Sequence, residues 1–208
     1  MSHSLDRFEV PTYNFASRLY DPEKASHSRP FGKGQDPVFF LEKPLPGFAH
    51  ALSEEDIVTV LKRVPKEDIA GVKWVMQLQP TKKQEKIESA WATYYWDLNV
   101  GRETGEAIAL YATNPASVFE WSSSLTPDDR RELERLESEG HTIEHHARGY
   151  RIHIKKEAVR NTQRRSLLHE IGHHVDRKRG VARFEAGSSM EKELFADRYA
   201  ARYLDSLR

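Results

Sequence analysis

Three absences narrow the possibilities for this chain of 208 residues. It has no cysteine, which excludes disulfides, thiolate metal ligands and a cysteine nucleophile. Its 32 Lys and Arg residues are balanced by 32 Asp and Glu residues, so net charge provides no attraction to nucleic acid or to a membrane surface. No segment approaches the ~18 consecutive apolar residues of a membrane span, and the initial stretch MSHSLDRFEV lacks the apolar core of a signal peptide. We therefore expect a cytoplasmic protein that does not insert into a membrane.

Prolines concentrate near the N-terminus. Six of the ten lie within residues 1–50, together with three glycines, and this composition forbids a long helix there. Aromatic residues in the same stretch, such as Tyr20, Phe39 and Phe40, are typical of a segment that packs against a folded domain. We expect a Pro-rich extended arm over residues 1–50, part of it lying against a single domain that spans residues 51–208.

Capping residues mark the ends of two helices that precede the most informative part of the sequence. Ser53 comes before an apolar face of helical period that Pro65 ends, so a core helix is expected between them. Thr126 and Pro127 begin a second helix, which Gly140 ends. Because this second helix is rich in acidic residues and poor in apolar ones, we expect it at the surface.

Apolar residues at alternate positions, with turn residues between the segments, indicate strands. The expected strands cover residues 72–79, 92–98, 107–112, 141–146 and 150–156. In the first strand the alternation predicts burial of one face only, with Val75 as the exception. The last two strands flank Arg148 and Gly149, which indicates a hairpin whose second strand buries Ile152 and Ile154.

The stretch LLHEIGHHVD, residues 167–176, concentrates acidic, basic and metal-ligand side chains within a helix expected over about residues 162–178. His169 and His173 are four residues apart, so both imidazoles project from one face and can bind one cation, with Glu170 beside them to reach a bound water. An ordinary amphipathic helix is the alternative, but the apolar residues around the motif imply burial, where His and Glu need partners. His174 lies ~100° around the helix from His173, so we expect it to be exposed or beside the site rather than a ligand.

Another helix with acidic residues is expected in SSMEKELFADRYAARYL, residues 188–204. Ser188 and Glu191 fit a capping box at its beginning. Glu193 and Asp197 lie four residues apart on one face, and the neighbouring alanines allow close packing against a second helix.

The two motifs together resemble those of the gluzincin metallopeptidases, in which HExxH on one helix is followed by Glu-x-x-Ala-Asp on the next. The resemblance covers only the C-terminal part of the chain. It implies a Zn²⁺ cofactor bound by His169, His173 and Glu193, with Asp197 accepting a hydrogen bond from the free ring nitrogen of a ligand histidine. It also implies an α+β, zincin-like fold, in which a small twisted mixed sheet accompanies an active-site helix and a C-terminal ligand helix. The residues at positions 176 and 179 exclude the metzincin pattern.

The implied activity is hydrolysis of a polypeptide substrate. Three protein ligands leave the fourth zinc position to water, and the zinc lowers the pKa of this water to roughly 7. Glu170, as general base, takes the proton of the water and returns it to the leaving amine. The family pattern places the strand before the active-site helix, here residues 150–156, along the cleft, where an extended substrate adds as a further strand. A donor to the oxyanion could come from Tyr150, His153 or His145, although a lone His153 on a strand is more often simply exposed.

A basic segment supports a second hypothesis. Residues 145–183 contain 11 Lys and Arg residues against three acidic ones. These charges could attract nucleic acid, but pairing with the acidic helix at residues 126–139 is the simpler interpretation. The second hypothesis is a non-catalytic, zinc-containing regulatory module that binds nucleic acid or a protein partner, as in stress-response or phage-type switches. The two hypotheses differ at the metal, because a structural zinc site fills the fourth position with a protein ligand.

Overall fold

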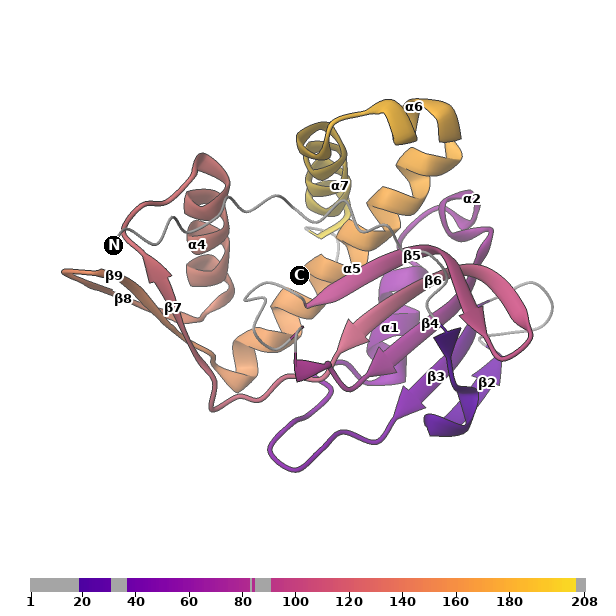
Figure 1. Ribbon diagram of the computed structural model, residues 1–208, viewed down its shortest axis with the longest axis horizontal. Coiled ribbons are helices and arrows are strands. Elements are labelled where there is room, and N and C mark those ends of the chain that lie inside the picture. The colour runs from indigo at the N-terminus through magenta and orange to yellow at the C-terminus, as the bar shows by residue number, and fades with distance from the viewer. Residues whose placement is uncertain (1–18, 31–36, 83, 85–90, 205–208) are drawn as a thin grey trace, which may run out of the picture.

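The computed structural model describes residues 19–30, 37–82, 84 and 91–204. They form an α+β structure with a larger mixed sheet and a smaller antiparallel sheet, joined by one long helix (Figure 1). The larger sheet contains β1 (Leu19–Tyr20), β2 (Ala25–Pro30), β3 (Val38–Glu42), β4 (Val72–Leu78), β5 (Ala92–Val100) and β6 (Glu103–Tyr111). The smaller sheet contains β7 (Val118–Ser122), β8 (Thr142–His146) and β9 (Gly149–His153). The helices are η1 (Pro22–Lys24), α1 (Glu54–Leu61), α2 (Lys66–Ile69), α4 (Pro127–Glu139), α5 (Lys156–Lys178), α6 (Val181–Ala186) and α7 (Ser189–Leu204). None of these described helices is long and apolar enough to cross a membrane.

The larger sheet has the strand order β1-β5-β6-β4-β3-β2. The hairpin β5–β6 is antiparallel, whereas β4 runs parallel to both of its neighbours, β6 and β3. The expected mixed sheet is therefore confirmed. Its strands β2 and β3 come from the stretch expected as an extended arm, and Phe39 of β3 is 4% exposed. Residues 1–18 of the expected arm lie outside the described residues.

Strand β4 is buried on both faces, which corrects the half-buried strand predicted from alternation. Val72 and Val75 belong to the apolar cluster that α1 and α5 cover, whereas Trp74 and Met76 belong to the cluster on the opposite face. A register shift between Val72 and Trp74 moves the alternation by one residue and places Val72 on the same face as Val75. Val75 breaks the sequence pattern because this second face is buried too. A central strand with both neighbours parallel is typically covered on both sides.

The predicted caps are present at the helix ends. Ser53 accepts a hydrogen bond from the Asp56 N–H at 3.1 Å and begins α1, and Thr126 caps α4 in the same way. Gly140 adopts a left-handed conformation with φ 108° and ends α4, as expected for a glycine C-cap.

Helix α5 begins at Lys156, earlier than predicted, and the preceding strand ends at His153 rather than at residue 156. The first turn of α5 buries Ala158 and Val159, and Val159 belongs to the cluster that α4 and the smaller sheet enclose. At the same end, the Lys155 N–H donates to His141 Nδ1 at 3.2 Å, so a buried histidine satisfies a backbone donor next to the helix start. Strand β7, which the sequence did not indicate, pairs with β9 along its whole length.

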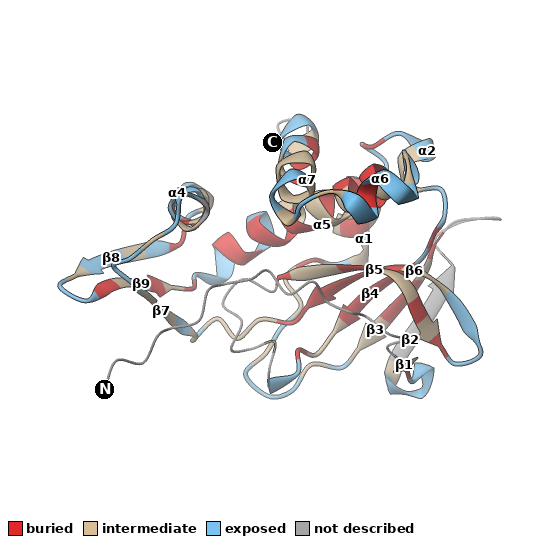
Figure 2. Cartoon of the chain, turned by 45° about the horizontal axis from the view of Figure 1, so that its top comes forward, coloured by how far each residue is buried: buried red, intermediate tan, exposed pale blue. Residues whose placement is uncertain are grey.

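Farther along α5, the same helix packs on the larger sheet. Leu167, Leu168 and Ile171 are fully buried between the sheet, α1 and α7. Figure 2 shows buried residues along much of α5, which runs from the smaller sheet to the larger one. The motif LLHEIGHHVD therefore lies in the part of α5 that contacts the larger sheet and α7.

Candidate metal centre

Helices α5 and α7 approach each other so closely that only glycine fits at one position of α5. A Cβ atom added to Gly172 would lie 2.7 Å from Ala196 Cα and 3.1 Å from Tyr199 Cβ. Ala196 is fully buried at the contact, in agreement with the expectation that small residues on α7 allow close packing. This contact sets the distance between the two helices, and it brings Glu193 of α7 over the HExxH turn of α5.

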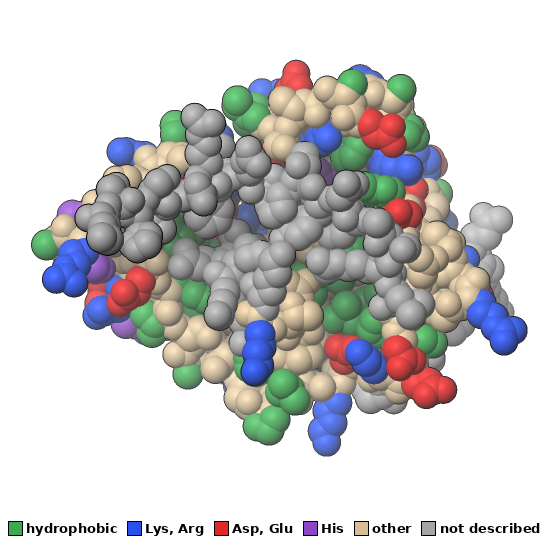
Figure 3. Space-filling view, viewed as in Figure 1, with side chains coloured by type: hydrophobic (Ala, Val, Ile, Leu, Met, Phe, Trp, Pro, Cys, Tyr) green, Lys and Arg blue, Asp and Glu red, His purple; other side chains and the backbone are tan. Residues whose placement is uncertain are grey.

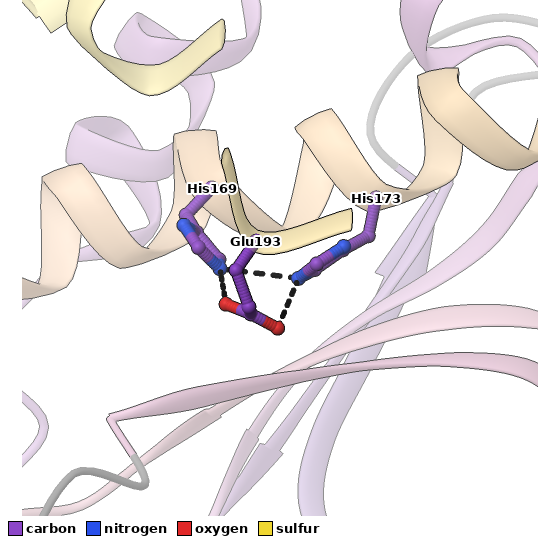
Figure 4. Close-up of side chains that lie close together, drawn as sticks. All are labelled: His169, His173 and Glu193. Carbon is purple, nitrogen blue, oxygen red and sulfur yellow. Dashed lines mark hydrogen bonds and ion pairs between the residues drawn. The ribbon is translucent and has the colours of Figure 1, made fainter. Parts of the chain in front are cut away.

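His169, His173 and Glu193 point toward one another from the two helices (Figure 4). The two Nε2 atoms of the histidines are 3.1 Å apart. Glu193 lies 3.1 Å from His169 Nε2 through one carboxylate oxygen and 3.5 Å from His173 Nε2 through the other. Among the described residues, this is the only group of three or more His, Asp or Glu side chains that could hold a metal ion.

The donor atoms fit a tetrahedral cation of the size of zinc. With bonds of about 2.0–2.1 Å, two neighbouring ligand atoms of a tetrahedral zinc site lie about 3.3 Å apart. The two Nε2 atoms are 3.1 Å apart, and the nearest Glu193 oxygen to each histidine lies at 3.1 or 3.5 Å, which is close to that value. Two imidazole nitrogens and one carboxylate are also the ligand types that zinc prefers when no thiolate is present. The cluster is open to solvent on one side, since the Glu193 side chain is 42% exposed.

Asp197 fixes the orientation of His169, as the resemblance implied. Its Oδ1 atom lies 3.0 Å from His169 Nδ1, so Nδ1 donates and Nε2 points into the cluster. Burial alone would lower the pKa of His169, but its hydrogen bonds to Asp197 and Glu193 outweigh burial and raise the pKa to about 10. For Glu193 the balance is reversed: burial would raise its pKa, whereas hydrogen bonds from His169 and His173 hold it well below the ordinary value. A cation in the cluster therefore competes with a proton.

The same Asp197 oxygen also accepts a hydrogen bond from a second helix. Arg135 of α4 donates to Asp197 Oδ1 through Nη1 at 2.7 Å. Burial would raise the pKa of Asp197, but the contacts with His169 and Arg135 hold it below the ordinary value. The sequence did not indicate Arg135, because nothing in its spacing ties α4 to a residue 62 positions away.

Glu170 is held beside the cluster by a backbone amide of the larger sheet. The Tyr94 N–H of β5 donates to Glu170 Oε2 at 2.7 Å. Burial raises the pKa of Glu170 above its ordinary value, although the charges of His173 and His169 work to lower it. A carboxylate with a raised pKa, one oxygen of which is fixed by an amide, is suited to accept a proton.

His174 is buried and is not part of the cluster, so of the two expected positions, exposed or beside the site, the first is wrong. Only 2% of its side chain is accessible; Nδ1 contacts the Glu106 carboxylate and Nε2 lies 3.3 Å from the Ala70 carbonyl. Glu106 of β6 also accepts from the Tyr94 hydroxyl at 2.6 Å and from Arg177 at 3.1 Å. Burial would raise the pKa of Glu106, but these donors hold it below the ordinary value. Glu106 thus ties β5, whose Tyr94 N–H holds Glu170, to the last turns of α5, a role that the sequence did not indicate.

The three candidate oxyanion donors are not brought to the cluster. His145 and Tyr150 contact each other with ring centroids 4.9 Å apart, and His153 lies 3.2 Å from Glu144. All three belong to β8 and β9, which lie at the end of the molecule away from α7 (Figure 1). Strand β9 also pairs with β7 on one edge and β8 on the other. A substrate therefore cannot add to β9 as a further strand, and the strand beside Glu170 is instead β5.

The basic segment is largely matched by partners within the chain. Arg165 lies 2.9 Å from Glu132 and 2.5 Å from Glu139, so the predicted pairing with the acidic helix is present. Four further members have partners as well: Arg164 pairs with Asp56, Arg177 pairs with Glu106, Lys178 donates to the carbonyls of Glu67 and Ala70, and Arg179 covers the Phe195 ring. On the face shown in Figure 3, basic and acidic side chains are interspersed. The charges that motivated the nucleic-acid hypothesis thus have a structural explanation.

No protein-family model matches this chain, and no curated protein and no solved structure proved similar to it.

Proposed function

We propose that the chain is a zinc-dependent peptidase with a minimal zincin-like fold. The observation that carries the proposal is the convergence of His169 Nε2, His173 Nε2 and the Glu193 carboxylate, with the Glu170 carboxylate on the same turn of α5. The α+β architecture with a mixed sheet and a ligand-bearing helix pair is consistent with such a fold.

His169, His173 and Glu193 would hold the metal. Zinc bound by three protein ligands acts as a Lewis acid and lowers the pKa of water to about 7. Within the described residues, the group contains three ligand side chains and no fourth. This count favours a catalytic site over a structural one, in which the fourth position would be a protein ligand.

Each remaining residue has a role that follows from its contacts. Glu170 takes a proton from the attacking water and returns it to the leaving amine, and its raised pKa suits both transfers. The Tyr94 N–H fixes one oxygen of Glu170, which leaves the other oxygen to exchange the proton. Asp197 holds His169 in the tautomer whose Nε2 faces the cluster.

The substrate class rests on the resemblance of the two helix motifs to those of gluzincins. Such a site hydrolyses the amide of a peptide bond, and Glu170 supplies the proton that the leaving amine needs.

The test combines metal analysis with a peptide library. Purified wild-type protein should contain about one zinc per chain, and His169→Ala should lose it. Wild-type protein should cleave peptides in the library, as measured by mass spectrometry, whereas Glu170→Gln should retain the metal and the fold but lose cleavage. Equal zinc in wild type and His169→Ala would reject the metal assignment. Cleavage that survives in Glu170→Gln, or zinc without any cleavage by the wild type, would reject the catalytic one.

A further inference from the structure

A groove of about 910 Å³ lies between α4, α5 and α7, and Asp197 is one of the residues that line it. Five arginines and three carboxylates line the groove, and two carboxylates outside the lining, Glu132 and Asp56, pair with three of these arginines. The groove therefore gathers guanidinium groups on a chain whose net charge is zero, and the donors that remain free decide what it can bind.

Two of the arginines hold the walls of the groove together. Arg165 is 11% exposed and bridges α5 to Glu132 and Glu139 of α4. Arg135 links α4 to Asp197 of α7. These ion pairs keep the three helices at a fixed separation, so the groove keeps its shape without a ligand.

Two other arginines retain donors for a ligand. Arg198 is exposed and, in the part of the chain that the structure describes, makes no hydrogen bond or ion pair. Arg164 has one ion pair, to Asp56 at 3.2 Å, which occupies only one Nη atom of its guanidinium. A guanidinium offers five N–H donors in a planar fork that matches the oxygens of a phosphate. Ala200, Ala201 and Leu204 add an apolar wall beside these donors.

We propose that this groove binds a small molecule that carries phosphate groups, with the phosphates on Arg164 and Arg198 and an apolar moiety against α7. The volume lies within the roughly 300–1,000 Å³ of small-molecule sites. The free donors of Arg164 and Arg198 match the oxygens of phosphate groups on such a ligand. An extended nucleic acid is less suitable, because it requires basic side chains along a surface, and Arg177, Lys178 and Arg179 at the end of α5 are already engaged.

The site is distinct from the metal-binding cluster but shares a residue with it. Asp197 faces Arg135 at the groove and His169 at the cluster through the same oxygen. A ligand in the groove lies beside this link, on the α4 side of it. The proposal does not depend on the peptidase proposal, since it concerns binding alone.

The test measures binding of pyrophosphate and of adenosine diphosphate to the full chain by titration calorimetry. The buffer contains EDTA, so that contacts between phosphate and a metal at His169 and His173 contribute nothing. We expect saturable binding of one molecule per chain, weakened about tenfold or more in Arg198→Ala and Arg164→Ala, because each loses a charged donor pair. Arg198→Lys should fall between wild type and Arg198→Ala, since lysine keeps the charge but not the fork.

Arg202→Ala is the matched control. Arg202 is exposed on the same helix, and its guanidinium lies over the Tyr203 ring 5.4 Å from the centroid, outside the groove lining. Circular dichroism establishes that each variant is folded. The proposal is overturned by the absence of saturable binding up to about 10 mM ligand, or by an equal loss in Arg202→Ala and Arg198→Ala. Stronger, Arg198-dependent binding of an oligoglutamate peptide or an oligonucleotide would likewise overturn it, because the groove would then serve a macromolecule.

Discussion

Replacing Gly172 by alanine perturbs the contact that sets the distance between the two ligand-bearing helices. The new Cβ would lie 2.7 Å from Ala196 Cα, whereas carbon atoms in contact prefer about 3.5 Å or more. Helix α7 must therefore move away by roughly 0.8 Å, the difference between these two distances. Zinc sites tolerate about 0.2 Å in ligand distance, so Glu193 would lose its place in the cluster.

Two energies of opposite sign enter the stability of Gly172→Ala. Alanine gains about 1 kcal/mol over glycine in a helix interior, whereas overpacking a close contact costs about 1–3 kcal/mol. We expect a net destabilisation of about 0–2 kcal/mol in urea unfolding and a loss of zinc affinity of about tenfold or more in chelator competition. Zinc affinity is a sharper test than stability, because the higher helix propensity of alanine does not compensate for a displaced metal ligand.

Gly180→Ala is the control for Gly172→Ala. A Cβ added to Gly180 would meet only Arg183 Cβ at 3.7 Å, an ordinary contact, and its extended backbone suits any residue. Zinc affinity should therefore stay at the wild-type value in Gly180→Ala. If Gly172→Ala is more stable than wild type and binds zinc with unchanged affinity, the close contact does not position the ligands.

Three further predictions follow from the contacts around the cluster. Asp197→Ala should weaken zinc binding by about 10 to 100-fold in chelator competition, whereas the exposed control Glu137→Ala should not; equal affinities would make Asp197 an ordinary surface residue. The pKa of His169 in the metal-free protein is raised to about 10, so protonated His169 contributes to the stability of the fold. This contribution is complete below the unfolded-state pKa of about 6.5 and is lost as the pH rises through about 10. Zinc binding at about pH 8 should then release about one proton, measured by calorimetry in buffers of different ionisation heat, and release near zero would refute the raised pKa. Glu106→Gln should destabilise the protein by about 2–4 kcal/mol in urea unfolding, because it disrupts the half-buried network of Glu106 with Tyr94, His174 and Arg177. The control Glu103→Gln on the same strand removes only an exposed ion pair and should cost less than about 1 kcal/mol, so equal costs would contradict the role of the network.

The local features of the fold were predictable wherever one short segment determines them. The capping boxes of α1 and α4 depend on side chains three residues apart, and the predicted caps at Ser53 and Thr126 are confirmed. The two-sided burial of β4 was not predictable, because it depends on β3, a strand from the proline-rich region, becoming its parallel neighbour. Parallel pairing between segments more than thirty residues apart leaves no local pattern in the sequence.

The same division applies to the cluster. His169, His173 and Glu193 came from helical spacing and a motif resemblance, and the structure brings them together. The partners that orient the cluster were missed, because the Tyr94 contact uses a backbone N–H that every non-proline residue has, and Arg135 reaches Asp197 from a separate helix. Such contacts are decided by how distant elements pack.

Helix α5 passes from one apolar cluster to another, and the cluster of ligands lies along it. Its first turns pack against α4 through residues such as Val159, and its later turns pack on the larger sheet through Leu168 and Ile171. Local opening of the HExxH turn would have to release apolar contacts that hold the whole fold, so this turn belongs to the slowest-opening part of the molecule. Small zinc domains are unfolded without their metal, because they have no core to hold the ligands. In this chain the core holds His169, His173 and Glu193 together, so under the proposed function a metal would be gained and lost by a protein that stays folded.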